Sequence, residues 1–145
     1  MIYLLDINVL IALCDPAHPH AEAARTFFRE EMVREGWATC PLTQNGFLRI
    51  FGSRKYPGGP GSPSGARLIL AGLVAAPGHQ FWKDDLSLLS AVEYPGLPTS
   101  GGVTDFYLLA LARKHGGRLA TFDAGMDASL LPGGAGAYYL VGLRR

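Results

Sequence analysis

The sequence predicts an α/β fold, a three-layer α/β/α sandwich with a central, mostly parallel sheet of five strands. Short apolar runs alternate with helical stretches along the chain, and strands that are connected through helices pair in parallel. The length of 145 residues matches one ordinary domain, so residues 1–145 are expected to fold as a single unit. Apolar residues make up 48% of the chain, which is enough to build a substantial core.

Five short apolar runs are expected to form the strands. They cover residues 2–5, 37–40, 80–82, 118–122 and 138–141. Runs of this length suit strands that are buried on both faces of a parallel sheet. Glycines at 116–117 and at 133–136 mark the turns that lead into the last two strands.

Helices are expected in the segments between the strands. They cover residues 8–14, 20–35, 43–51, a segment that ends at 76, a short stretch that begins at Asp84 and Asp85, and 105–115. Apolar side chains at helical spacing predict the helix at 20–35, and Gly36 ends it. The expected N-caps are Thr43, Ser62 or Ser64, and Thr104. Residues 57–65 are rich in Pro and Gly and form a flexible surface loop that lacks the Lys-Ser/Thr end of a phosphate-binding loop.

Composition excludes several classes of protein. A net charge of +1 argues against a protein that coats DNA, although local basic patches remain open. Asp6 interrupts the apolar start of the chain and no basic segment precedes it, so a signal peptide is not expected. The longest later apolar run, 68–76, is too short to cross a bilayer, and we expect a soluble, cytoplasmic protein. Cys14 and Cys40 have no metal-binding or redox spacing and are expected to be unpaired thiols.

Three acids from remote parts of the chain are predicted to meet at one edge of the sheet. Asp6 directly follows the first strand, and Asp123 directly follows the fourth. Asp105 opens the helix before the fourth strand, and that helix must begin at the same edge because it runs antiparallel to the strand. Ligands of open parallel sheets bind at this edge, where the strands end. Asp105 also shares a helical face with the apolar residues that pack on the sheet.

Each acid also has an ordinary structural interpretation. Asp6 can be the N-cap of the following helix, Asp105 a first-turn acid beside its cap, and Asp123 a turn residue. Three carboxylates within a few ångströms of each other remain ionised only beside a cation. A cluster without His or Cys favours a hard ion, Mg²⁺ or Mn²⁺, which polarises phosphoryl oxygens and activates water. This chemistry fits phosphodiester hydrolysis.

Three segments, residues 4–10, 103–108 and 119–123, resemble the motifs of PIN-domain nucleases. The matching metal-binding positions are Asp6, Asp105 and Asp123, and the polar positions that support them by hydrogen bonds are Asn8, Thr104 and Thr121. Segment 37–50 further resembles the VapC toxins of bacterial toxin–antitoxin pairs. The resemblance implies Mg²⁺-dependent endoribonuclease cleavage of single-stranded RNA, held in check by a VapB-type antitoxin. The sequence leaves a homodimer open.

One departure from the family concerns a Glu that many members carry after the second strand. Gln44 aligns with it and brings no charge, which favours one metal ion over two. Asp84 or Asp85 is an alternative source of the missing charge, and capping the helix expected there is the simpler role for them. A non-catalytic module that binds antitoxin or RNA is therefore a second reading. A phosphatase with Asp6 as nucleophile ranks last, because Asn8 stands where such enzymes carry a second Asp.

Several further side chains are candidates for binding. Arg49, Arg54 and Lys55 can meet RNA phosphates or simply be solvated surface charges. Tyr56, Tyr107 and Trp82 are candidates for stacking a base or for the core. The loop that holds His18 and His20 is expected to lie away from the acidic edge, as a solvated turn. The 57–65 loop and the helix that follows it offer an adaptable surface for an antitoxin.

Overall fold

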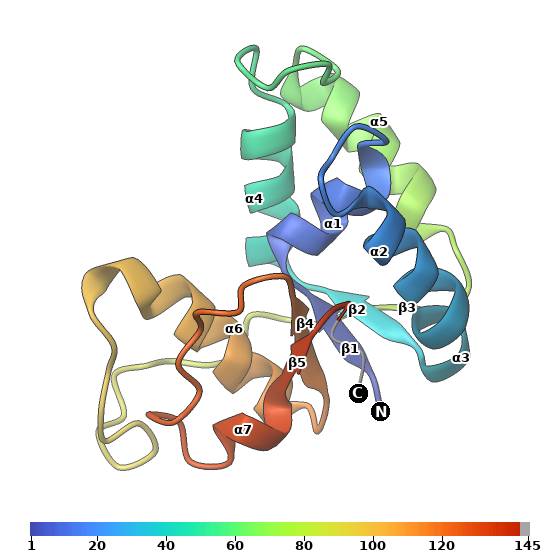
Figure 1. Cartoon of the computed structure of the whole chain (residues 1–145). Coiled ribbons are helices and arrows are strands. Elements are labelled where there is room, and N and C mark those ends of the chain that lie inside the picture. Colours follow the sequence, from blue (N-terminus) through green and yellow to red (C-terminus); the bar gives the residue numbers. More distant parts are fainter. Residues whose placement is uncertain (143–145) are drawn as a thin grey trace.

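The computed structural model describes residues 1–142 and contains a five-stranded sheet in which every pair of neighbours is parallel. The strands are β1 (Tyr3–Leu5), β2 (Trp37–Thr39), β3 (His79–Phe81), β4 (Arg118–Thr121) and β5 (Tyr138–Leu140). Their order across the sheet is β3-β2-β1-β4-β5 (Figure 1). The predicted α/β sandwich is confirmed, and each expected strand is present to within a residue or two.

Helices cover both faces of the sheet and also extend beyond it. They are α1 (Ile7–Cys14), α2 (Ala21–Phe27), α3 (Val33–Glu35), α4 (Pro41–Phe51), α5 (Pro63–Val74), α6 (Val103–Lys114) and α7 (Gly134–Ala137). A π-helical stretch, Phe28–Met32, joins α2 to α3. Figure 1 shows α2 and α3 on one side of the sheet, α6 and α7 on the other, and α1, α4 and α5 above it.

Strand β1 is central and divides the core in two. Tyr3 and Leu5 point into a cluster with residues of α1, α2, α4 and α5, whereas Leu4 points into a cluster with α6 and α7. This alternation follows from the period of two along a strand. Leu4 and Leu5 are fully buried, as expected for a strand that is covered on both faces.

Two helices begin elsewhere than predicted. Helix α4 starts at Pro41, and Thr43 in its first turn exchanges hydrogen bonds with its N-cap Cys40, so Thr43 completes a capping box and is not the cap. Helix α6 starts at Val103 after a short 3₁₀ turn and has Gly102 as its N-cap, which leaves Thr104 exposed inside the first turn. In the 3₁₀ turn, the backbone N–H groups of Gly102 and Val103 donate to the carbonyl oxygens of Thr99 and Ser100, so two N–H groups at the helix start have backbone partners. Ser62 caps α5 by accepting from the Gly65 backbone N–H.

The helix expected at Asp84 and Asp85 does not form. Residues 82–87 have no regular structure, and Asp84 Oδ2 accepts a hydrogen bond from the Leu42 backbone N–H at 3.0 Å. Asp84 thereby caps α4 from outside, and Asp85 pairs with Lys114 at the end of α6. Asp84 therefore does cap a helix, but the helix is α4, whereas Asp85 forms an ion pair and caps none.

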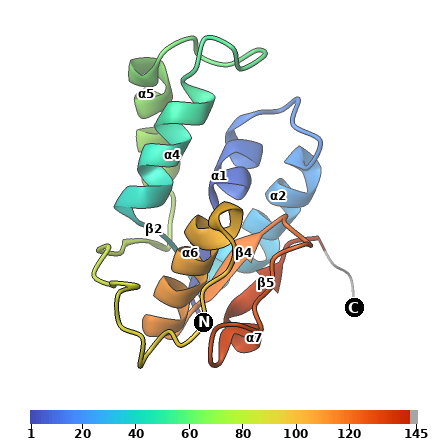
Figure 2. The ribbon, with the colours of Figure 1, turned by 90° about the vertical axis from the view of Figure 1, so that its left-hand side faces the viewer.

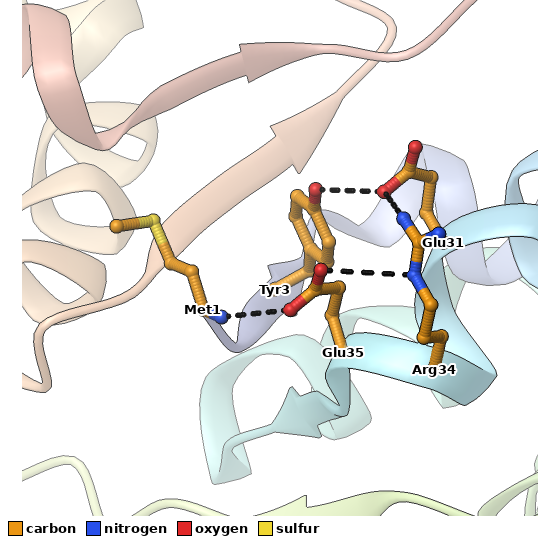
Figure 3. Close-up of polar contacts among 5 residues, drawn as sticks. All are labelled: Met1, Tyr3, Glu31, Arg34 and Glu35. Atoms are coloured by element: carbon orange, nitrogen blue, oxygen red, sulfur yellow. Dashed lines mark hydrogen bonds and ion pairs between the residues drawn. The ribbon is translucent and has the colours of Figure 1, made fainter.

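The start of β1 is tied to the helix that packs beside it. Figure 3 shows the Tyr3 hydroxyl donating to Glu31, which also binds Arg34, while Glu35 binds both Arg34 and the amino group of Met1. These contacts fix the amino-terminal edge of the sheet and leave the opposite, carboxyl edge for the acids. Within residues 1–142 no helix has the length and apolar character that a membrane crossing demands. Cys14 and Cys40 are unpaired, as predicted.

Candidate functional site

The three predicted acids line one pocket at the carboxyl edge of the sheet. The pocket has a volume of about 390 Å³, and its lining residues are Asp6, Ile7, Asn8, Ile11, His18, Ile50, Tyr56, Asp105 and Asp123. Asp6 comes from the end of β1, Asp123 from the end of β4, and Asp105 from the first turn of α6. The structure therefore brings the three acids together at the edge where the sequence placed them.

Asp6 is the most buried of the three acids, with 6% of its surface exposed. Its Oδ1 accepts from the Ile7 backbone N–H at 2.7 Å, and its Oδ2 accepts from the Thr121 hydroxyl at 2.7 Å. Burial raises the pKa of Asp6, and the two hydrogen bonds oppose that rise. Asp6 is thus both the N-cap of α1 and a wall of the pocket.

The hydroxyl of Thr121 connects the ends of β1 and β4. It is fully buried, donates to Asp6, and accepts from the Asp123 backbone N–H at 3.0 Å and from the Asn8 amide at 3.5 Å. The Asn8 carbonyl oxygen in turn accepts from the Phe122 backbone N–H at 3.4 Å. Asn8 and Thr121 therefore lie directly beside the acids and hold them in place.

Asp105 and Asp123 face each other across the pocket. The pKa of Asp105 is raised to about 6, first by burial, then by the negative charges of Asp6 and Asp123 and by a hydrogen bond with Asp123. Asp123 Oδ1 also accepts from the Gly125 backbone N–H at 2.8 Å, as a turn residue does. The Asp105 carboxyl group therefore keeps its proton to a higher pH than an ordinary Asp side chain does.

The donor set of the pocket fits a hard divalent cation. The pKa values of Asp6 and Asp105 are raised, and a positive charge in the pocket would favour the ionised form of both. Carboxylate oxygens are also the ligands that Mg²⁺ and Mn²⁺ prefer. In residues 1–142 no group of three or more His, Cys, Asp or Glu side chains forms a ready-made metal cage.

Three other predicted residues lie outside the pocket lining. Thr104 is exposed in the first turn of α6. Gln44 donates its amide to the Thr39 hydroxyl at 3.0 Å, and Thr39 also bonds His79 at 2.7 Å. Asp84 is occupied in capping α4. The negative charge of the pocket therefore comes from its three Asp residues.

Helix α4 and the turn after it form one flank of the pocket. Ile50 and Tyr56 line the pocket, and the predicted basic residues of the same segment, Arg49, Arg54 and Lys55, are exposed. In the part of the chain that the structure describes, no salt bridge joins these three cations to an acid. They are available for a polyanion that approaches this flank.

The aromatic candidates differ in their positions. Tyr56 is half-buried at the pocket, and its hydroxyl donates to Asp15 Oδ2 at 2.6 Å. Trp82 is buried and stacks on His115, and Tyr107 is half-buried beside Asp84, so neither lines the pocket. Of the three, the structure brings only Tyr56 to the acids.

His18 was predicted to lie away from the acidic edge, and that prediction was wrong. His18 lines the pocket, and His20 stacks on Phe122 with ring centroids 4.4 Å apart. The reason is that α1 does not fold back along the sheet: it rises from the carboxyl edge and packs against α4 and α5 (Figure 2). Four consecutive buried residues, Val9 to Ala12, show that α1 is enclosed on all sides. That continuous apolar run was the signal in the sequence.

Comparison with known proteins relates the whole arrangement to a family. A model described as PIN domain matches residues 3–128. The chain is 42% identical over 135 residues to Ribonuclease VapC39 of Mycobacterium tuberculosis, covering 92% of this chain and 96% of that protein. It is 41% identical over 132 residues to Ribonuclease VapC44 of the same organism, covering 90% and 92%.

The fold is also similar to a solved structure. The crystal structure of VapBC2 from Rickettsia felis bound to a DNA fragment from their promoter superimposes with a TM-score of 0.59. The match covers 85% of this chain and 89% of that chain, at 15% sequence identity. At that identity the likeness concerns the fold.

Proposed function

The chain belongs to the PIN-domain family, and from this premise we propose that it is a metal-dependent endoribonuclease that cleaves single-stranded RNA. The observation that carries the proposal is the pocket in which Asp6, Asp105 and Asp123 meet. Two relatives that are called ribonucleases align with 90% or more of the chain, which supports the same activity. The reaction is hydrolysis of an internal phosphodiester bond.

Asp6, Asp105 and Asp123 would hold the cation, Mg²⁺ or Mn²⁺. When bound, such an ion supplies Lewis-acid activation of the phosphodiester and of water. A single ion is the simpler arrangement, because Gln44 adds no charge and its amide is bonded to Thr39. Two ions would need a further carboxylate on the pocket wall, and Asp84 and Asp85 are engaged elsewhere.

Hydrogen bonds from neighbouring residues position two of the three carboxylates. Thr121 and the Ile7 N–H occupy one lone pair on each oxygen of Asp6, which fixes the plane of that carboxylate and leaves its remaining lone pairs for the pocket. Asn8 and Thr121 restrain the backbone of 122–123 in the same way. The first turn of α6 places the positive end of a helix dipole beside Asp105. Such preorganised groups need no rearrangement when charge develops on the phosphate.

We further propose that the protein is the toxin of a type II toxin–antitoxin pair and acts in the cytoplasm. The structural neighbour is a VapBC assembly, so a VapB-type antitoxin is the proposed partner. Helix α5 offers an apolar surface for it, because Leu68 is 76% exposed and Ile69 is 38% exposed. A basic side chain of the antitoxin can reach the acidic pocket and neutralise it.

The test is a gel assay of purified protein on a mixed pool of single-stranded RNA, with Mg²⁺ or Mn²⁺ titrated from none to excess. Cleavage should require the metal and stop in chelator. Asp6→Asn should abolish cleavage and leave the melting curve cooperative, because the amide keeps the shape of the side chain and removes its charge. Gln44→Glu should leave cleavage intact or increase it in Mn²⁺.

Three outcomes contradict the proposal. Cleavage that persists in chelator or in Asp6→Asn points to a contaminant or to another mechanism. Wild-type protein that binds metal and cuts no RNA supports the alternative, a non-catalytic module that binds antitoxin or RNA. Expression that does not slow growth, with no complex formed on co-expression with a neighbouring small protein, contradicts the role as a toxin.

A further inference from the structure

The loop between α1 and α2, residues 15–20, contributes His18 to the lining of the acidic pocket and is fixed at both ends. At one end, the Tyr56 hydroxyl donates to Asp15 Oδ2 at 2.6 Å. At the other end, the ring of His20 lies flat on Phe122, with an interplanar angle of 12°. Phe122 stands between Thr121 and Asp123, so this stacking joins the loop to the strand end that carries the acid. His18 is therefore held in the lining of the pocket and is not a solvated turn residue.

The ring of His18 has a defined orientation. Its Nδ1 accepts a hydrogen bond from the backbone N–H of His20 at 3.0 Å. That N–H group can only donate, so Nδ1 carries the lone pair, and the neutral ring carries its proton on Nε2. Burial and the nearby His20 lower the pKa of His18, which favours the neutral ring. Among the described residues, the Nε2–H group has no hydrogen-bond partner.

We propose that the His18 Nε2–H group donates a hydrogen bond to a backbone phosphate of the RNA substrate and positions the strand over the pocket. This inference rests on the proposed function and assigns a substrate-binding residue to the same site. It concerns the phosphate backbone, so it is independent of base sequence.

The surroundings of His18 explain why a neutral donor suits this position. The three carboxylates that line the pocket repel a phosphate and would attract any nearby cationic side chain. A Lys or Arg here would pair with those acids and compete with the metal ion. A neutral N–H group attracts a phosphate oxygen without that competition. The neighbouring flank has three exposed cations, Arg49, Arg54 and Lys55. They can bind further phosphates of the RNA backbone at a distance from the acids.

Binding of RNA to an inactivated protein provides the first test. Fluorescence anisotropy with a labelled single-stranded RNA pool compares Asp6→Asn with Asp6→Asn/His18→Ala. Loss of one hydrogen bond to a charged group should raise Kd about tenfold. His18→Gln keeps an N–H donor and should recover part of the affinity. His115→Gln, a matched change of a histidine outside the pocket, should leave Kd unchanged. Melting curves of all variants verify that they are folded.

A second test locates the phosphate. Once the cut site is mapped, each neighbouring phosphate is replaced in turn by an uncharged methylphosphonate. His18→Ala should raise KM about tenfold on normal RNA and change kcat by less than threefold. On the one substrate that lacks the contacted phosphate, His18→Ala should have no further effect on KM, a pattern that a merely structural role does not produce.

The outcomes separate this inference from the proposed function. If the Asp6→Asn proteins with and without His18 bind RNA equally, or if neither binds it, the inference about His18 is wrong. If wild type cleaves RNA and His18→Ala has the same KM, the proposed ribonuclease activity is supported and the proposed His18 contact is wrong. If wild type cleaves nothing while the binding difference is tenfold, the nuclease activity fails and the phosphate contact stands.

Discussion

At the scale of single residues, the side chains of the site each have a structural task as well as a place in the pocket. Asp6 caps α1, Asp123 closes a turn, and the Thr121 hydroxyl joins the two. The hydrogen bonds that cap the helix and close the turn are therefore also the ones that hold the acids in the pocket. The consequence is that changes at these residues affect stability and function together, and each experiment needs a measurement of both.

Thr121→Val tests the central hydroxyl. Valine keeps the shape and leaves the Asp6 carboxylate, the Asp123 N–H and the Asn8 amide without their shared partner. We expect a loss of about 1–3 kcal/mol in the free energy of unfolding, the usual effect of leaving buried polar groups unsatisfied. Urea denaturation measures it. The exposed Thr104→Val should stay within about 0.5 kcal/mol of wild type. Equal losses in both variants would contradict the role given to Thr121.

The raised pKa of Asp105 predicts that the free energy of unfolding of the metal-free protein depends on pH. Its pKa is about 6 in the folded chain against 3.8 for the ordinary group, so between those values the folded state keeps a proton that the unfolded state has released. Stability must then fall as pH rises from about 4 to about 6. Because the group is only half-buried, solvent screening limits the fall to about 1–2 kcal/mol.

The measurement is urea denaturation in chelator at several pH values, for wild type and Asp105→Asn. The Asn variant should lack this part of the decline, although Asp6, whose pKa is also raised, contributes a decline of the same sign in both proteins. Parallel stability curves for the two proteins between pH 4 and 6 would show that Asp105 is not perturbed.

At the scale of elements, the direction of α1 decides what surrounds the pocket. The sequence predicted the strands, the order of the helices and the three acids, because apolar runs and strand-end acids are local patterns. It did not predict that α1 packs against the pair formed by α4 and α5, since that choice depends on contacts between segments far apart in the chain. The position predicted for His18 was therefore wrong, and that of Tyr56 was left undecided. Asp6 and Asp123, which directly follow strands, lie where they were predicted.

Asp84 shows the same limit for helix caps. Its carboxylate was predicted to begin a helix of its own, and it caps α4 instead through Leu42. Asp84→Ala should lower the free energy of unfolding by about 1 kcal/mol, a typical value for the loss of a cap. The neighbouring Lys83→Ala is the control and should have little effect. A change in metal affinity in Asp84→Ala would contradict its placement outside the site.

At the scale of the whole molecule, the parallel sheet with β1 at its centre brings the acids together. Strand β1 pairs with β2 on one side and with β4 on the other, so the two acid-bearing strand ends are neighbours. Alternating apolar runs predicted a parallel sheet, but the order β3-β2-β1-β4-β5 required the structure. Pairing of β1 with β4 joins segments that no local pattern relates.

Metal binding should be visible in global stability. An ion that binds only the folded protein raises the free energy of unfolding by about 2.7 kcal/mol at a concentration one hundred times its Kd. We expect Mn²⁺ or Mg²⁺ to raise Tm by several degrees, and Asp105→Asn to weaken that shift. Asp84→Ala should retain it. Thermal melts of wild type that coincide with and without metal would refute the metal site.

The hydrogen bond between Thr121 and Asp6 spans 115 positions of the chain. A ribosome that adds about 5–20 residues per second synthesises Thr121 about 6 to 23 s after Asp6. Throughout that interval β1 has no β4 beside it, and the nascent chain has no complete acidic pocket. The proposed ribonuclease activity therefore requires β4, and a chain that ends before residue 118 lacks Thr121 and Asp123 and is expected to cut no RNA.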